Sequence, residues 1–279
     1  MKFDDQFFSV YSECFPMLGT ADHVMAEKLD CADLLVRKSG DGVTGFAAVD
    51  GNAVLLVCVH PEHQGKGLGS SLLAEAEELI RSRGYDRAVL GRSERDIFWG
   101  AVIDTMSHRF FEKRGYTAFN GTLSMVLDAE DIPSDGSFGR RTLPEGLSYK
   151  AVIGGDISDV LEAVARVEPK WLKFYEKAGS SVIIKAVLSG RTVGFLTADT
   201  DAGTIITGKD NRTGLLGYVG VVPEERNRGI GLGMVAYAAE YMKSQGCTEV
   251  YVNYTSLDEW YAKLGFVENL WYWMGEKIL

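Results

Sequence analysis

Two stretches of the chain place apolar residues at helical spacing directly after a cluster of glycines. In residues 70–84 the apolar residues at helical spacing are Leu72, Leu73, Ala76, Leu79 and Ile80, and the pattern stops at Gly84. Residues 234–246 repeat this arrangement and stop at Gly246. Apolar residues three and four positions apart cover one face of a helix, and a glycine commonly ends it. The pattern therefore predicts two helices, each of which begins at a glycine-rich loop.

Short apolar runs broken by glycine-containing turns precede each of these helices. They cover residues 34–60 in the first half and residues 181–200 and 214–222 in the second. A further run follows each helix, at residues 87–91 and 249–254. Runs of this length and composition are typical of β-strands. Each half is therefore predicted to be α/β, with strand, glycine loop, helix and strand at its centre.

The two halves are copies of one pattern, joined by a linker. Residues 57–90 align without a gap on residues 219–252. The repeat is as long as a domain, which indicates two related domains and not a solenoid. Between the copies lies a stretch rich in Asp, Ser, Gly and Pro that has no hydrophobic period, which is typical of a connecting segment. We therefore predict a first domain at residues 1–128, a linker at 129–146 and a second domain at 147–279.

Composition narrows the classes of partner. The 279 residues carry a net charge of −10, whereas a nucleic-acid-binding protein normally presents a basic face, so no nucleic acid is predicted. A cationic amine or peptide suits this charge better. No signal peptide is visible and no apolar stretch is long enough to cross a bilayer, so we predict no membrane partner. The four cysteines are isolated, which predicts free thiols in a cytoplasmic protein.

The glycine loops suit a pyrophosphate group. They read G-x-G-x-G, at Gly65, Gly67 and Gly69 and again at Gly229, Gly231 and Gly233. This spacing fits neither the nucleoside-triphosphate loop, G-x-x-x-x-G-K-[ST], nor the dinucleotide fingerprint, G-x-G-x-x-G. Backbone N–H groups of residues without Cβ can converge on phosphates, and the positive end of the following helix adds to the attraction. A glycine-rich turn that binds nothing is the alternative.

The wider pattern resembles the acetyl-coenzyme-A loop of the GNAT superfamily of N-acetyltransferases. The family loop reads [Q/R]-x-x-G-x-G after a valine-rich strand and Pro-Glu, as do residues 64–69 and 226–231. The resemblance implies acetyl-coenzyme A as co-substrate and two domains that each hold a mixed, mostly antiparallel sheet flanked by helices. No metal is predicted, because His60 and His63 have a ligand-like spacing but no third ligand is evident. It implies a coenzyme site in the second domain at Val219, Val221, Arg226, Asn227, Arg228, Gly229, Ile230, Gly231 and Gly233. The corresponding positions of the first domain are Val59, Gln64, Gly65, Lys66, Gly67, Leu68, Gly69 and Ser70.

The resemblance also implies one catalytic residue. Many GNAT members carry the phrase Y-x-x-x-G-F, whose tyrosine protonates the departing coenzyme A thiolate. The second domain has Tyr261 in this phrase, whereas the first domain has Phe111. A phenol has a pKa of about 10, which suits this task. We therefore predict that Tyr261 is catalytic, with packing of the last helix as the alternative role for this aromatic residue.

Other parts of the mechanism remain open at this point. The resemblance places the oxyanion donor near Val221, and Gly220 in the same strand indicates either a bulge or room for a neighbouring side chain. No general base stands out among Glu224, Glu225, Asp258 and Glu259. The first domain either binds coenzyme A without catalysis, or has a vestigial loop, or works without the tyrosine. Its insertion at residues 91–109 is expected to contact substrate or to act as a lid.

The leading hypothesis is transfer of an acetyl group from acetyl-coenzyme A to a primary amine of a small molecule or peptide, with the chemistry in the second domain. A catalytically silent coenzyme-A-binding sensor is the alternative, and hydrolysis of the thioester is a third. The identity of the amine and the oligomeric state are not predicted.

Overall fold

The chain folds into two compact units. A computed structural model describes residues 3–16, 18–19, 22–93, 95, 97–133, 135, 137–139, 142–177, 182–200 and 212–279. The first unit contains the described residues up to Leu123 together with Leu270–Leu279, and the second contains the described residues from Ser124 to Asn269.

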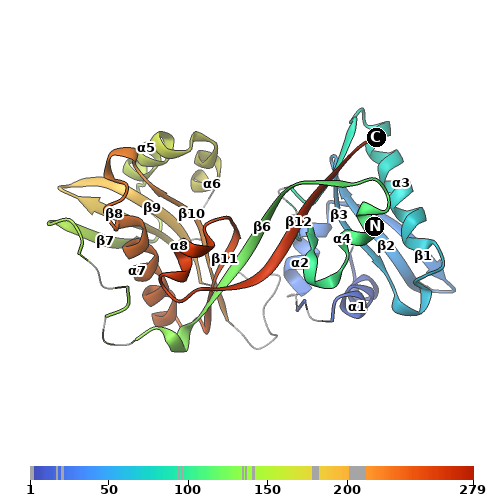
Figure 1. Ribbon diagram of the computed structural model, residues 1–279, viewed down its shortest axis with the longest axis horizontal. Helices are drawn as coiled ribbons and strands as arrows, with labels where there is room; N and C mark the ends of the chain where they lie inside the picture. Colours follow the sequence, from blue (N-terminus) through green and yellow to red (C-terminus); the bar gives the residue numbers. More distant parts are fainter. Residues whose placement is uncertain are drawn as a thin grey trace. The chain divides into compact units, whose positions relative to one another are not determined.

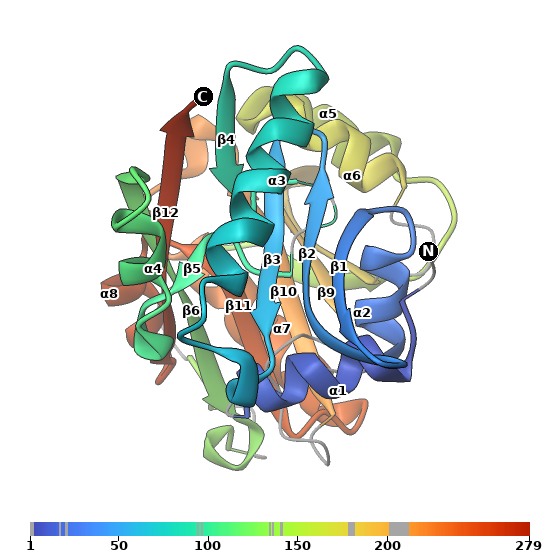
Figure 2. The same cartoon turned by 90° about the vertical axis from the view of Figure 1, so that its right-hand side faces the viewer.

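The first unit is a sheet with helices on both faces (Figures 1 and 2). Its helices are α1 (Asp5–Cys14), α2 (Asp22–Leu29), α3 (Leu68–Ser82) and α4 (His108–Glu112). Its strands are β1 (Asp33–Ser39), β2 (Gly42–Asp50), β3 (Ala53–Val59), β4 (Arg87–Leu90), β5 (Ala101–Val102) and the first part of β6 (Thr117–Asp128). The strand order is β1-β2-β3-β4-β12-β6, where β12 (Val267–Ile278) comes from the C-terminus, and β5 pairs with β12.

Side-chain alternation along β2 decides which helix covers which face. Phe46 packs edge-on against Phe7 of α1, whereas a Cβ on the preceding Gly45 would lie 3.4 Å from Leu72 of α3. Because neighbouring residues of a strand point to opposite faces, α1 and α3 lie on opposite sides of the sheet. Figure 2 shows α3 lying across β3 and β2.

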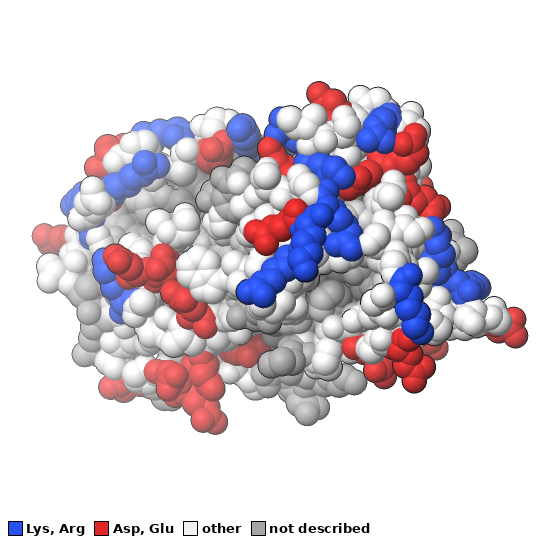
Figure 3. Space-filling model, turned by 45° about the vertical axis from the view of Figure 1, so that its right-hand side comes forward, with Lys and Arg blue, Asp and Glu red and all other residues white. Residues whose placement is uncertain are grey.

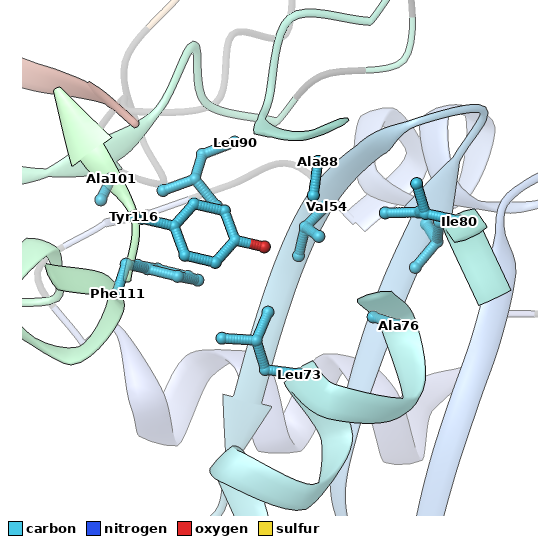
Figure 4. Close-up of a cluster of buried hydrophobic side chains, with 10 residues drawn as sticks. Val54, Leu73, Ala76, Ile80, Ala88, Leu90, Ala101, Phe111 and Tyr116 are labelled. Atoms are coloured by element: carbon cyan, nitrogen blue, oxygen red, sulfur yellow. The ribbon is translucent and has the colours of Figure 1, made fainter. Parts of the chain in front are cut away.

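The core of the first unit lies beneath α3. Figure 4 shows the ring of Tyr116 between Leu90 and Phe111, next to Val54 and Ala101. All five side chains are buried. Since Ala101 belongs to the insertion at residues 91–109, this segment is part of the hydrophobic core of its own unit.

The second unit repeats the plan. Its helices are α5 (Ser158–Val167), α6 (Leu172–Glu176), α7 (Ile230–Ser244) and α8 (Asp258–Ala262). Its strands are β7 (Leu147–Val152), β8 (Val182–Leu188), β9 (Arg191–Asp199), β10 (Thr213–Val221) and β11 (Glu249–Thr255), in the order β6-β11-β10-β9-β8-β7. The α5 and α6 helices cover one face and α7 the other (Figure 1).

The predicted α/β class with a mixed sheet is confirmed. The pairs β3/β4 and β10/β11 are parallel, and the pairs β1/β2, β2/β3, β7/β8, β8/β9 and β9/β10 are antiparallel. Both predicted helices follow their glycine loops. The α3 helix ends at Ser82, and Gly84 with φ of +86° takes the left-handed conformation that commonly follows a helix end.

The units do not divide the chain at the linker expected from the sequence. Residues 129–133, which fall in that linker, belong to the second unit, and Ala129 N–H donates to the carbonyl of Thr248 over 3.0 Å. Residues 270–279, which fall in the expected second domain, belong to the first unit, where β12 pairs antiparallel with β4. The sequence repeat therefore identifies which segments correspond in the two copies, but it does not identify which strands pair.

Candidate functional site

A cleft opens in the second unit where two parallel strands separate. The β10 and β11 strands pair from Thr213 opposite Glu249 to Leu216 opposite Val252. A cleft of about 880 Å³ begins at this point. Its lining comes from the end of β10, the glycine loop, the first turn of α7, the end of β11, and α8.

The end of β10 bulges at the cleft. Two residues, Tyr218 and Val219, lie opposite a single residue of β9, because the pairing jumps from Gly217 opposite Thr197 to Gly220 opposite Phe195. Tyr218 has a φ of +51°, and its carbonyl accepts a 2.9 Å hydrogen bond from the buried Tyr175 hydroxyl. A bulge of this kind bends a strand and re-aims its backbone. The backbone of residues 219–221 consequently lines the cleft.

Gly220 is required by its neighbours. A Cβ at this position would lie 2.4 Å from the ring of Phe195, a separation that no side chain tolerates. Both interpretations of Gly220 are therefore correct, because the strand bulges here and the glycine also makes room for Phe195.

The glycine loop forms one wall of the cleft. Arg226 donates from Nε to the carbonyl of Val221 over 3.0 Å, which ties the loop back to its strand. Asn227 and Gly229 have φ values of +60° and +78°, and α7 begins at the next residue, Ile230. The cleft is lined by these predicted coenzyme residues: Val219, Val221, Arg226, Asn227, Gly229, Ile230 and Gly231.

Two predicted coenzyme residues do not line the cleft. The guanidinium of Arg228 pairs with the buried carboxylate of Glu225. Gly233 lies within α7, where a Cβ would meet the Tyr149 hydroxyl at 2.3 Å, and that hydroxyl donates to the Ile230 carbonyl over 3.0 Å. The third glycine of the motif therefore allows close packing between α7 and β7.

Tyr261 lies in α8 and lines the cleft. It is only 4% exposed, and the rings of Trp260 and Phe266 pack edge-on against it. Burial raises the pKa of the Tyr261 phenol well above its usual value, and the phenol is protonated at neutral pH, as an ordinary phenol would be. A protonated hydroxyl at the cleft can act as an acid. In the first unit Phe111 holds this position and has no proton to give.

Sequence reasoning missed three polar or aromatic residues of the cleft. Asn253, Tyr254 and Thr255 follow the last residue of β11 that pairs with β10, and they line the cavity. The Asn253 Oδ1 atom is buried and has no hydrogen-bond partner within the described structure. A polar residue directly after the apolar run at residues 250–252 was the available signal.

No described carboxylate or histidine of the cleft is free to take a proton. Among the described residues that line it, Glu225 is the one carboxylate and no histidine occurs. Glu225 is held by Arg228 and by Arg191 at 3.8 Å. Glu224 pairs with Arg166 at 2.6 Å, away from the cleft. Asp258 and Glu259 do not line the cavity either, so none of the four carboxylates considered from the sequence stands free at the cleft.

The first unit has the same loop without an open cleft. Gln64 donates to the Val59 carbonyl over 2.8 Å, as Arg226 does to Val221. The loop glycines Gly65 and Gly67 have positive φ, α3 begins at Leu68, and Gly69 packs on Phe110. Lys66 donates to the carbonyl of Glu62, and the Ser70 hydroxyl contacts Arg114.

The space between β3 and β4 is filled. A cavity of only about 50 Å³ remains there, and β3, Leu90, Phe98, Ala101 and Phe111 are among its lining. These positions correspond to β10, Val252 and Tyr261 of the open cleft, with Phe98 and Ala101 added from the insertion at residues 91–109. The insertion therefore occupies the position where the second unit has its cavity, a role that the sequence did not suggest.

The described surface carries both signs of charge. Figure 3 shows a short row of Lys and Arg side chains near the middle of the face that it depicts, and further Lys and Arg toward its edges, interspersed with Asp and Glu. The described residues of this face therefore form no broad basic surface. No helix of the described segments is long and apolar enough to cross a membrane.

Two matches to known protein families fall one on each unit. Residues 30–118 match the acetyltransferase (GNAT) domain and residues 157–266 match the acetyltransferase (GNAT) family. The chain belongs to the GNAT acetyltransferases. It carries two domains of this family in tandem and is an acyltransferase.

Similar proteins span most of the chain. A mycothiol acetyltransferase of Arthrobacter sp. (strain FB24) is 26% identical over 80% of this chain and 71% of its own length. A solved glucosamine N-acetyltransferase region of a fungal multi-domain GH3 β-N-acetylglucosaminidase is 25% identical, with a TM-score of 0.82. That match covers 98% of this chain but 37% of the longer fungal protein.

A tandem GNAT protein from the clavulanic acid biosynthesis pathway shares the fold. It has a TM-score of 0.71 at 19% identity, and the match covers 97% of this chain and 93% of that protein. The predicted tandem GNAT organisation is confirmed.

Proposed function

We propose that this GNAT protein transfers an acetyl group from acetyl-coenzyme A to a primary amine of a small molecule or peptide, in the cleft of the second unit. One observation carries the proposal. The glycine loop, the bulged end of β10 and the buried Tyr261 hydroxyl all line one cavity of about 880 Å³, whereas the corresponding space in the first unit is filled.

Each wall of the cleft supplies one requirement of the reaction. The loop N–H groups and the start of α7 suit the pyrophosphate of the coenzyme. A backbone N–H of residues 219–221 suits the oxygen of the thioester carbonyl, where negative charge develops. Tyr261 suits the thiolate, because it lines the cleft and its phenol carries a proton at neutral pH. The amine loses its proton to water, since the described part of the cleft offers no free carboxylate.

The relatives suggest which amines to test first. One is named a glucosamine N-acetyltransferase region and another a mycothiol acetyltransferase. An amino sugar is therefore the first choice of acceptor, followed by amino acids, polyamines and peptides with a free N-terminus.

Release of free thiol tests the proposal. The full chain is incubated with acetyl-coenzyme A, with and without each amine, and the thiol is measured over time. Release that depends on an amine, together with acetylated amine in the mass spectrum, is the expected result. Release without amine would mean hydrolysis, and coenzyme A binding without release would mean the sensor. Absence of coenzyme A binding would overturn the proposal.

A further inference from the structure

The first unit holds two cysteines next to each other on the face of its sheet that α1 covers. The ring of Phe46 lies 5.3 Å from that of Phe7 on α1. Cys58 is the register partner of Phe46 on β3, so both side chains point to this face. Cys14 lies seven residues after Phe7, which returns it to the same side of the helix. The Cys14 thiol donates over 3.1 Å to the carbonyl of Val59, the residue directly after Cys58, which places the two cysteines side by side.

The second unit shows that the fold itself brings these two positions together. Cys58 aligns with Gly220 in the sequence repeat, and Cys14 ends α1 as Val167 ends α5. In the second unit Val167 Cγ1 would lie 3.1 Å from a Cβ on Gly220. Both corresponding positions of the first unit are cysteines, so the repeated architecture places their side chains next to each other.

The two thiols differ in exposure and in acidity. Cys14 is half-buried and Cys58 is fully buried. The hydrogen bond from Cys58 lowers the pKa of the Cys14 thiol, whereas burial raises the pKa of Cys58. The thiolate is the form that reacts with oxidants. Cys14 is therefore the thiol that an oxidant meets first, and Cys58 is placed to react with the product.

We propose that Cys14 and Cys58 are a peroxide-sensitive pair that forms a reversible disulfide within the first unit. The Cys14 sulfur attacks one oxygen of hydrogen peroxide, the O–O bond breaks, and the departing hydroxide leaves as water. The sulfenic acid at Cys14 is then attacked by the Cys58 sulfur. The S–O bond breaks and a second water leaves. Two thiols lose two electrons in total, which reduce one peroxide to two waters.

The bond forms by movement at the end of α1. The two sulfurs must close to about 2.05 Å, and Cys14 is the last residue of the helix, where the Phe15 N–H donates to the Tyr11 carbonyl. A small thiol can reduce the disulfide again, because it reaches the half-buried Cys14 sulfur and displaces Cys58.

Peptide mapping of the full chain tests the proposal. The protein is treated with one equivalent of hydrogen peroxide, remaining thiols are alkylated in denaturant, and the chain is digested with trypsin. Cys14 falls in peptide 3–28, Cys58 in 39–66, Cys31 in 29–37 and Cys247 in 244–263. We expect the first two peptides to be joined, with loss of two of the four thiols, and dithiothreitol to restore all of them.

Matched variants separate this pair from general oxidation. Cys14→Ser is expected to abolish the cross-linked peptide, while Cys31→Ser at an exposed site leaves its yield unchanged. Cys58→Ala is a second variant that should leave Cys14 as a sulfenic or over-oxidised acid. Recovery of Cys14 and Cys58 as separate alkylated peptides after oxidation would overturn the proposal. So would a disulfide of either cysteine with Cys31 as the main product.

Discussion

At the scale of single residues, Tyr261 and Phe111 mark the chemical difference between the two copies. Both are buried on the short helix that follows the last central strand of their unit. The phenol lines an open cleft, whereas the phenyl ring lines a filled one. The pattern Y-x-x-x-G-F was enough to find Tyr261. Its burial, which raises its pKa, is a property of the fold.

Replacement of Tyr261 by Phe should lower kcat by about tenfold or more, because a positioned acid contributes at least this much. The affinity for coenzyme A should change little.

The raised pKa of the Tyr261 phenol predicts that the step served by Tyr261 loses no rate as pH rises to about 10, where an ordinary phenol would begin to ionise. Steady-state kinetics from pH 6 to 10, with Tyr85→Phe as an exposed control, checks this. Unchanged kcat in Tyr261→Phe would show that the acid lies elsewhere.

Asn253 should contact the pantetheine arm of the coenzyme. Its buried Oδ1 has no donor within the described part of the chain and lies where β10 and β11 separate, while the arm carries amide N–H groups. Asn253→Ala should weaken coenzyme A binding by about tenfold, the equivalent of a lost hydrogen bond of ~1.4 kcal/mol. It should leave binding of adenosine 3′,5′-bisphosphate, which lacks the arm, unchanged. Calorimetry with both ligands measures the difference.

Asn269→Ala is the control for this experiment, because Asn269 lies in the same unit and does not line the cleft. Equal weakening of both ligands by Asn253→Ala would indicate a general loss of structure. Unchanged binding of both would mean that Asn253 does not reach the arm.

At the scale of elements, two nearly identical strand–loop–helix units surround very different spaces. Gly67 and Gly229 both precede a helix of 15 residues and have φ values of +85° and +78°. The sequence therefore predicted two equivalent loops. It could not predict the filled cavity of the first unit, because Phe98 and Ala101 reach it from an insertion whose packing depends on the strand that returns from the C-terminus.

The difference in cavity volume predicts one coenzyme A per chain. A side chain at either loop glycine costs about 1–2 kcal/mol, because a non-glycine residue resists the left-handed conformation. Gly229→Val should weaken coenzyme A binding by about tenfold or more. Gly67→Val imposes the same strain in the first unit and should leave the affinity unchanged. Calorimetry of the wild type that finds two sites, or weakening by Gly67→Val, would show that the first unit binds as well.

The sequence predicted elements more fully than it predicted their contacts. Glycine stops, apolar spacing and the repeat gave both long helices and the central strands. The packing role of Gly233 against Tyr149 was not predictable, because β7 lies far away in the sequence. The bulge at Tyr218 was signalled only by a glycine. Whether a cavity is filled depends on side chains that are distant in the sequence, and no local pattern specifies them.

At the scale of the whole molecule, the first unit depends on the last ten residues of the chain. Leu279 N–H donates to the Asp86 carbonyl over 2.8 Å, and Arg87 pairs with Glu276. Trp273 and Leu279 pack against the core beneath α3. A repeat in the sequence shows which segments are related, but it does not show which strands pair. The expected boundary at residue 128 could not anticipate this return.

Lys277 makes this dependence measurable. Its ammonium lies 2.7 Å from Glu77 on α3, a carboxylate that is 8% exposed and whose other oxygen has no hydrogen-bond partner among the described residues. Lys277→Met should cost about 1–3 kcal/mol, because it leaves a buried charge unpaired. Thermal unfolding and hydrogen exchange should show the loss of stability, with faster exchange in α3.

Lys38→Met at an exposed position should change neither the unfolding temperature nor the exchange rate, and the double variant Glu77→Met/Lys277→Met should regain stability. A Lys277→Met protein as stable as the wild type would show that the C-terminal strand holds the first unit by its backbone and apolar contacts alone.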